Sequence, residues 1–228
     1  MLSKLKSLVK RFFLFITFRD VRRAARNKKN IARLKSKDIT IISSNCTGGV
    51  ISHDLGLRFN SQFVNLAMRP KHFVKYLSNF DYYNSLDVSF PAELQSECWG
   101  GGHYPVGVVG DTEIHFIHYS SYEEALKKWN ERKARINKDS LFIIMSERDG
   151  CTKEDLLAFD ALPFKNKVVF TKLPYEDIKS SFYIPGFEKD RYVGVVLSFK
   201  NIFSSKRIVD IFPYVDWFNG DYSVEDSK

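Results

Sequence analysis

The stretch Leu141-Phe142-Ile143-Ile144-Met145 is an unbroken apolar run, and it decides the fold. Such a run is typical of a strand that is buried on both faces, as in the interior of a parallel sheet. Two further strand-like runs, at 39–43 and 167–171, lie before and after it in the chain. Helical patterns alternate with these runs. The sequence therefore predicts one α/β domain with a mainly parallel, Rossmann-like sheet flanked by helices.

Start signals support the helices between these strands. Pro70 is suitably placed in a first helical turn, Ser120 or Ser121 can cap the following helix, and Thr152 can cap the next one. The helices are predicted over residues 71–83, 122–136, 153–162 and 206–218. Two more strands are expected, at 63–67 and within 104–119.

Charge divides the chain into an arm and a body. Residues 1–37 hold 13 Lys and Arg against one acid, whereas the remaining residues hold 22 basic against 26 acidic side chains. A nucleic-acid reader usually carries its basic face on the folded body, so no nucleic-acid partner is expected. We predict a basic arm over 1–37, the α/β domain over 38–222 and a tail over 223–228.

The arm begins with residues 2–18, LSKLKSLVKRFFLFITF, whose apolar residues recur at helical spacing among lysines. Its continuous apolar run is far shorter than the roughly 20 residues that a membrane-spanning helix needs. This pattern predicts a basic amphipathic helix that lies on an anionic membrane surface, with residues 2–37 as the contact. The alternatives are a solvated extension and a helix packed on the body or on a partner.

Three separated cysteines, Cys46, Cys98 and Cys151, make a poor disulfide framework. A reducing cytosol is the simplest compartment, so the arm would hold the protein at the inner face of the cell membrane. The sequence has no phosphate-binding loop and no cysteine and histidine set with structural-zinc spacing. No metal is expected.

Ligands of parallel sheets bind at the carboxyl ends of the strands, where "SSNCTGG" (43–49) follows the first strand. A helix that starts near Gly48 or Gly49 would place Cys46 at its N-terminus, which favours the thiolate. Backbone amides of the two glycines could bind an oxyanion, and Asn45 could add a donor. The structural alternative is a lone cysteine that acts as a small buried side chain.

A thiol nucleophile needs a base, and His115 is the preferred histidine because it shares a strand face with Glu113. Asp149 could orient the histidine, and Arg148 could clamp a carboxylate or phosphate. His103 lies in a glycine loop that could close over the site, and Lys172 follows the 167–171 strand. The alternatives are a satisfied histidine, an ordinary surface loop and an Asp-Gly turn.

The motifs "SSNCTGG…LGLRFNSQFVNL", "GDTEIHFIHY", "RDGCT", "FDALPFKNKVVFT" and "YVDWFNG" resemble, in order and spacing, a bacterial family. This is the family of domain of unknown function 1919, whose members are usually labelled exopolysaccharide or capsule biosynthesis proteins. The resemblance covers about residues 38–220. Ser44-Asn45-Cys46 is also similar to the Gly-Asn-Cys-Gln motif of a coenzyme A-binding capsule enzyme family, with Thr47 in place of the glutamine.

These resemblances imply transfer of an acyl group from acetyl-CoA or another acyl-CoA to a glycan or a lipid-linked glycan. Cys46 would then be the nucleophile, His115 the base and Asp149 its orienter. Three alternatives stay open at this point: a thiol-dependent hydrolase of acylated glycans, a glycosyltransferase, and a non-enzymatic assembly protein.

Overall fold

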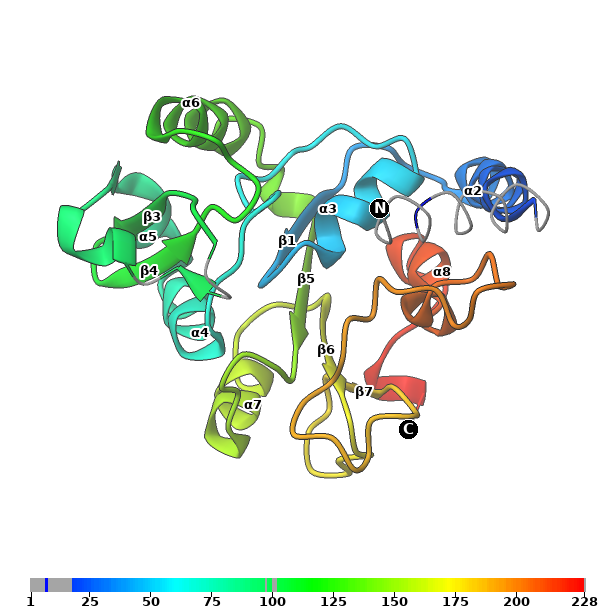
Figure 1. The fold of residues 1–228 in the computed structure, drawn as a ribbon. Helices are drawn as coiled ribbons and strands as arrows, with labels where there is room; N and C mark the ends of the chain where they lie inside the picture. Colours follow the sequence, from blue (N-terminus) through cyan, green and yellow to red (C-terminus); the bar gives the residue numbers. More distant parts are fainter. Residues whose placement is uncertain (1–6, 8–17, 97, 100–101, 228) are drawn as a thin grey trace.

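The computed structural model describes residues 7, 18–96, 98–99 and 102–227 (Figure 1). Its main sheet has four parallel strands in the order β1-β5-β6-β7. The strands are β1 (Thr40–Ser43), β5 (Leu141–Ser146), β6 (Lys167–Thr171) and β7 (Ser181–Tyr183). The predicted α/β class and mainly parallel sheet are therefore confirmed.

Side chains of the central strand alternate between two hydrophobic cores, as the unbroken apolar run predicted. Ile143 and Met145 enter one core together with Ile42 of β1. Phe142 and Ile144 enter the other core. All four of these β5 side chains are buried, so the strand is covered on both faces.

Helices cover both faces of the sheet (Figure 1). One face carries α3 (Thr47–Asp54) and α8 (Tyr214–Phe218). The other carries α4 (Pro70–Ser78), α5 (Phe80–Ser85), α6 (Tyr122–Lys133) and α7 (Lys153–Asp160). A small antiparallel sheet packs with the second group, and its strands are β2 (Val88–Ser89), β3 (Val106–Val109) and β4 (Thr112–His115).

The predicted start signals are present. Pro70 opens α4, and the Ser121 side chain accepts a hydrogen bond from the backbone N–H of Glu124 at 3.2 Å. Thr152 and Asp155 form a reciprocal capping box at the start of α7. Such caps typically contribute about 1 kcal/mol to helix stability.

Two predicted helices are interrupted in the structure. The helix expected over 71–83 breaks at Asn79, where φ is −135° and ψ is 58°, and α5 follows. The helix expected over 206–218 divides into the 3-10 turn η4 (Ile208–Ile211) and α8. Pro213 separates them, and proline has no backbone N–H with which to continue a helix.

The strand predicted at 63–67 is wrong. Only Ala67 pairs there, in an isolated antiparallel bridge to His115. Asn65 has a positive φ of 63°, which extended β structure does not allow. The segment nevertheless links the two sheets, because the backbone N–H of Met68 donates to the carbonyl of Ser44 at 2.9 Å.

The described part of the basic arm packs on the domain. Helix α2 (Arg19–Arg33) buries Arg23 between Asp54 at the end of α3 and Asp210 of η4. Asn30 of α2 donates to the hydroxyl of Tyr214 at 3.2 Å. The apolar pattern of residues 2–16 lies outside the described residues, except for Ser7. Within the described part of the chain, no helix is long and apolar enough to cross a membrane.

Candidate functional site

Cys46 lies at the carboxyl edge of the parallel sheet, between the end of β1 and the first residue of α3. The helix begins at Thr47, slightly earlier than predicted, so Cys46 occupies its N-cap position. Asn45 organises this turn, because its side-chain oxygen accepts the N–H of Thr47 at 3.0 Å. The amide of Asn45 also donates to the hydroxyl of Ser146, at the end of β5, at 3.3 Å. The ends of two neighbouring strands therefore meet at the cysteine.

Cys46 is a half-buried residue, and two opposing effects act on the pKa of its thiol. Burial raises its pKa, and the positive charge of Arg148 acts in the opposite direction. The net pKa lies above its ordinary value, so the free protein holds Cys46 mainly as the thiol near neutral pH. Cys46 therefore has to lose its proton before its sulfur can act as a nucleophile.

Gly48 and Gly49 are buried inside the first turn of α3, and neither has a positive φ. The absence of a side chain at Gly48 serves the packing of α3 on β1. A Cβ atom on Gly48 would lie 2.8 Å from the Ile41 Cγ2 atom and 2.8 Å from the Ser43 Cβ atom. Glycine thus lets α3 approach β1 closely. The N–H groups of a first helical turn have no intrahelical acceptor, so both glycines keep their capacity to bind an oxyanion.

We expect Gly48→Ala to lower the free energy of unfolding by about 1–2 kcal/mol, because overpacking costs more than the gain in helix propensity. The matched variant Gly49→Ala should cost less, since the atom nearest to its Cβ would be Cγ1 of Val64, at 3.3 Å. Urea unfolding of both variants measures the difference. Equal stability of Gly48→Ala and the unmodified protein would contradict the packing role.

His115 is fully buried at the end of β4, in the small sheet. Its Nε2 atom lies 2.6 Å from a carboxylate oxygen of Glu113, and its Nδ1 atom lies 3.4 Å from the hydroxyl of Tyr104. The Trp99 ring packs against the imidazole with centroids 4.0 Å apart. Burial lowers the pKa of His115, and Glu113 opposes that shift. The imidazole therefore holds a local polar cluster together.

The backbone places this cluster at a distance from Cys46. His115 pairs with Ala67, and the next residue, Met68, pairs with Ser44. Two strand spacings thus separate His115 from the end of β1, roughly 10 Å at the usual spacing. Both ring nitrogens of His115 already have partners within the cluster. This arrangement does not support His115 as the base for Cys46.

Asp149 does not orient His115 as predicted. The carboxylate that contacts the imidazole is Glu113, whereas Asp149 accepts a hydrogen bond from the Nε atom of Arg148 at 3.1 Å. Asp149 has a positive φ of 58° and Gly150 one of 88°, which identifies the tight Asp-Gly turn that was the alternative. Asp149 therefore positions Arg148 beside the edge where Cys46 lies.

Two predicted binding residues have other surroundings. The ammonium of Lys172 donates to the carbonyls of Asp190 and Arg191, at 2.9 and 3.1 Å. His103 is exposed on the loop that leads to β3. Lys172 lies at the carboxyl edge of the sheet, but its hydrogen bonds direct it toward the 190–191 loop. No contact joins His103 to Cys46 among the contacts of the described residues.

Sequence reasoning missed Glu147, which is the buried centre of this edge. Its carboxylate accepts the backbone N–H of Lys172 at 2.9 Å and the hydroxyl of Tyr175 at 3.0 Å. Its own N–H and carbonyl pair with Phe170 and Val193. A charged residue directly after an apolar strand was the available signal. Glu147 holds together the loops that follow β5 and β6. It thereby fixes the backbone that carries Arg148, the next residue in the chain.

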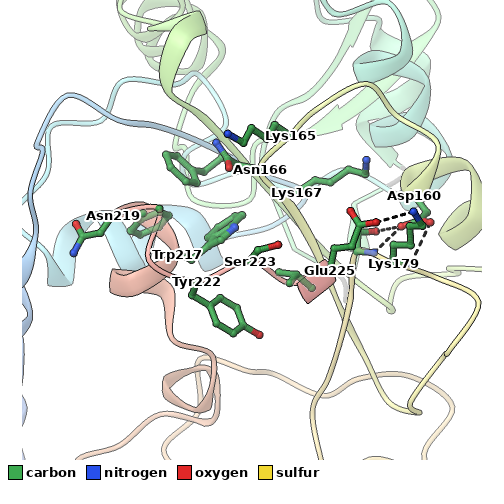
Figure 2. Close-up of a pocket in the computed structure, with 15 residues that line it drawn as sticks. Asp160, Lys165, Asn166, Lys167, Lys179, Trp217, Asn219, Tyr222, Ser223 and Glu225 are labelled. Carbon is green, nitrogen blue, oxygen red and sulfur yellow. Dashed lines mark hydrogen bonds and ion pairs between the residues drawn. The ribbon is translucent and has the colours of Figure 1, made fainter. Parts of the chain in front are cut away.

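A cavity of about 390 Å³ lies at the opposite edge, near the amino ends of β5 and β6 (Figure 2). Figure 2 shows Lys179 and Glu225 pointing toward each other beside Asp160, and the Lys179 and Glu225 side chains are 2.6 Å apart. Asp160 accepts the N–H and the hydroxyl of Ser180, both at 2.6 Å. The charged groups of this rim are thus largely paired with one another. The cavity contains none of the predicted site residues.

The described residues contain no group of three or more His, Cys, Asp or Glu side chains arranged to hold a metal ion. The candidate site consists of the Cys46 thiol, the first-turn amides of α3, and the side chains of Asn45, Ser146 and Arg148.

Comparison with known proteins gives two matches over most of the chain. A family model described as "Domain of unknown function (DUF1919)" matches residues 17–219. An uncharacterized protein of Haemophilus influenzae (strain ATCC 51907 / DSM 11121 / KW20 / Rd) is 44% identical over 217 residues, which cover 95% of this chain and 97% of that protein. The family is the one that the order of motifs indicated. Neither match states an activity.

Proposed function

The chain belongs to the DUF1919 family, and on this premise we propose that it is an acyltransferase of surface-polysaccharide biosynthesis. It would transfer an acyl group to a glycan or a lipid-linked glycan at the inner face of the cell membrane. One observation carries the proposal: Cys46, a half-buried cysteine, occupies a helix N-terminus at the carboxyl edge of a parallel sheet. Arg148 contributes a positive charge there.

In the proposed reaction the sulfur of Cys46 attacks the carbonyl carbon of an acyl thioester. The thiol loses its proton to water before the attack, the bond from the carbonyl carbon to the donor's sulfur breaks, and the departing thiolate takes up a proton. The first-turn amides of Gly48 and Gly49 stabilise the negative charge that develops on the carbonyl oxygen. The amide of Asn45 is already hydrogen-bonded to Ser146, so Asn45 serves to position the turn.

The second step returns the cysteine to its starting state. A sugar hydroxyl attacks the acyl-Cys46 carbon, the carbon–sulfur bond breaks, and the hydroxyl proton goes to the sulfur. Neither step changes an oxidation state, and the numbers of protons released and taken up over the two steps are equal. Because burial favours the thiol as the resting form, the reactive thiolate of Cys46 is the minor form near neutral pH.

The donor class is an acyl-CoA, and the charges of the site fit its phosphates only in part. Arg148 is half-buried and held by Asp149, which leaves guanidinium donors on its other side for an anion. Lys172 would have to exchange its two carbonyl partners for a phosphate. Arg148 is therefore the residue that we assign to the donor.

The proposal is tested by trapping the acyl-enzyme. The full chain is mixed with acetyl-CoA, quenched in acid, digested and analysed by mass spectrometry. We expect one acetyl group as a thioester on Cys46 and none on Cys151, a thiol whose pKa is raised by burial and by three nearby carboxylates. An acetyl label that is confined to lysines, or equal labelling of both cysteines, would refute the role of Cys46 as the nucleophile. Rapid loss of the Cys46 label in water without an acceptor would identify a hydrolase instead.

A further inference from the structure

Helix α2 has two chemically different faces. The inner face carries Arg23 and Asn30, both buried against the domain. The outer face carries exposed residues at helical spacing, starting at the N-cap residue. These outer residues are Phe18, Val21, Arg22, Ala25, Lys28 and Lys29. Phe18 and Val21 are large apolar side chains, 61% and 65% exposed.

A loop from the far end of the chain lies beside this outer face (Figure 1). The guanidinium of Arg22 donates to the carbonyl of Phe203 at 2.5 Å. That of Arg19 lies 4.1 Å from the centre of the Phe199 ring. The tip of the loop presents Ile202 and Phe203, each 59% exposed. Four exposed apolar side chains are therefore carried by two segments that touch; we call Phe18, Val21, Ile202 and Phe203 the tip patch.

The loop satisfies much of its own backbone. Phe199 and Arg207 form an antiparallel bridge, and the N–H of Lys200 donates to the carbonyl of Lys206 at 3.0 Å. The N–H of Phe203 donates to the side chain of Asn201 at 3.0 Å. A loop with internally paired donors can enter a less polar medium at a lower cost, because fewer hydrogen bonds to water are lost.

The surroundings of the tip patch are basic. Exposed cations come from both segments, and they are Arg22, Lys28, Lys29, Lys200 and Lys206. No acid occurs between residues 191 and 209, and Asp20 is the only acid between residues 19 and 37. Protein interfaces are usually poor in lysine, whereas an apolar group ringed by lysine and arginine is typical of binding to anionic lipid.

We propose that the tip patch inserts into the interfacial region of an anionic lipid bilayer, while the surrounding cations contact the headgroups. The predicted membrane contact, residues 2–37, already includes the outer face of α2, and the new part of the site is the 199–207 loop. The inference rests on the membrane location within the proposed function, but it does not need any chemistry at Cys46.

The test measures co-sedimentation of the full chain with vesicles of pure phosphatidylcholine and vesicles that also contain phosphatidylglycerol. We expect binding to the anionic vesicles, and a loss of roughly tenfold or more in affinity for Ile202→Asp/Phe203→Asp. The matched control is Leu157→Asp, on the distant helix α7, where the leucine is 44% exposed. It should bind like the unmodified protein.

A second measurement reports insertion directly. Phe203→Trp in the chain of residues 1–228 should show a blue-shifted emission on anionic vesicles and quenching by brominated lipid. If Ile202→Asp/Phe203→Asp binds as tightly as the unmodified chain, or if brominated lipid does not quench the introduced tryptophan, the proposal is overturned. A third outcome would also overturn the proposal. The unmodified chain would self-associate in solution and not bind vesicles, and the double variant would abolish the self-association, which would identify the tip patch as a protein–protein interface. Cys46→Ala should bind vesicles normally, so failure of the acyl-transfer proposal remains distinguishable.

Discussion

Replacing Arg23 by methionine is expected to lower the free energy of unfolding by about 3–5 kcal/mol, because it removes one partner of a buried ion network. Arg23 has 9% side-chain exposure, and its partners Asp54 and Asp210 have 7% and 0%. Burial opposes the charge of Arg23, but hydrogen bonds and charges of the two carboxylates outweigh it and raise the pKa of the guanidinium. Removing the guanidinium would leave two buried carboxylates without the cation that lies nearest to them.

Neighbouring cations cannot replace Arg23 fully. The Nε atom of Arg26 is 3.6 Å from a carboxylate oxygen of Asp210, and that of Arg207 is 3.6 Å from one of Asp54. These contacts are long for charge-assisted hydrogen bonds, which typically measure about 2.7–2.9 Å. Methionine keeps much of the side-chain volume, so the measured loss reports charge more than packing. Urea unfolding followed by circular dichroism measures it.

The control for this prediction is Arg33→Met on the same helix. Arg33 pairs with Asp216, but the two side chains are 45% and 35% exposed. Exposed pairs are usually worth about 1 kcal/mol or less, so this variant should lie close to the unmodified protein. Similar losses for both variants would show that the Arg23 network is not the main link between α2 and the domain.

The sequence predicted this docking poorly because ion pairs leave no periodic signal. Arg23 is 31 positions from Asp54 and 187 positions from Asp210. Apolar runs behave differently, because a strand that is buried on both faces needs consecutive apolar residues, and these are visible in its own sequence. The run at 141–145 therefore located the central strand and the two-core arrangement. The caps at Ser121 and Thr152 were also predictable, because each acts within four residues.

Interrupted helices escaped prediction for a related reason. Phe73 and Tyr76 before the break at Asn79, and Phe80 and Tyr83 after it, are all buried in the same core. The apolar spacing continues through the break, so periodicity alone cannot locate it. At the site, strand spacing correctly paired Glu113 with His115. Contacts of His115 with Trp99 and Tyr104 depend on how a loop returns to the sheet, which spacing does not encode.

Replacement of Cys46 is expected to have a large effect on acetyl-transfer activity. If the acyl-enzyme route holds, Cys46→Ala should reduce acetyl transfer from acetyl-CoA by roughly 10³-fold or more, since losing a nucleophile removes the whole covalent route. Cys46→Ser should be nearly as impaired. A serine hydroxyl needs a base within hydrogen-bond reach, and the buried His115 is held by Glu113 and Tyr104 instead. Cys151→Ala is the matched control and should retain activity.

The pH profile separates a chemical role of Cys46 from a structural one. Burial raises the pKa of Cys46 and Arg148 lowers it, so activity should rise with pH as the thiol deprotonates. Arg148→Gln removes the lowering contribution. The ascending limb of kcat/KM should therefore move to higher pH in that variant, with vesicle binding unchanged. An unshifted limb, or full activity of Cys46→Ala, would leave Cys46 with a structural role only, as a small side chain at the N-cap position of α3.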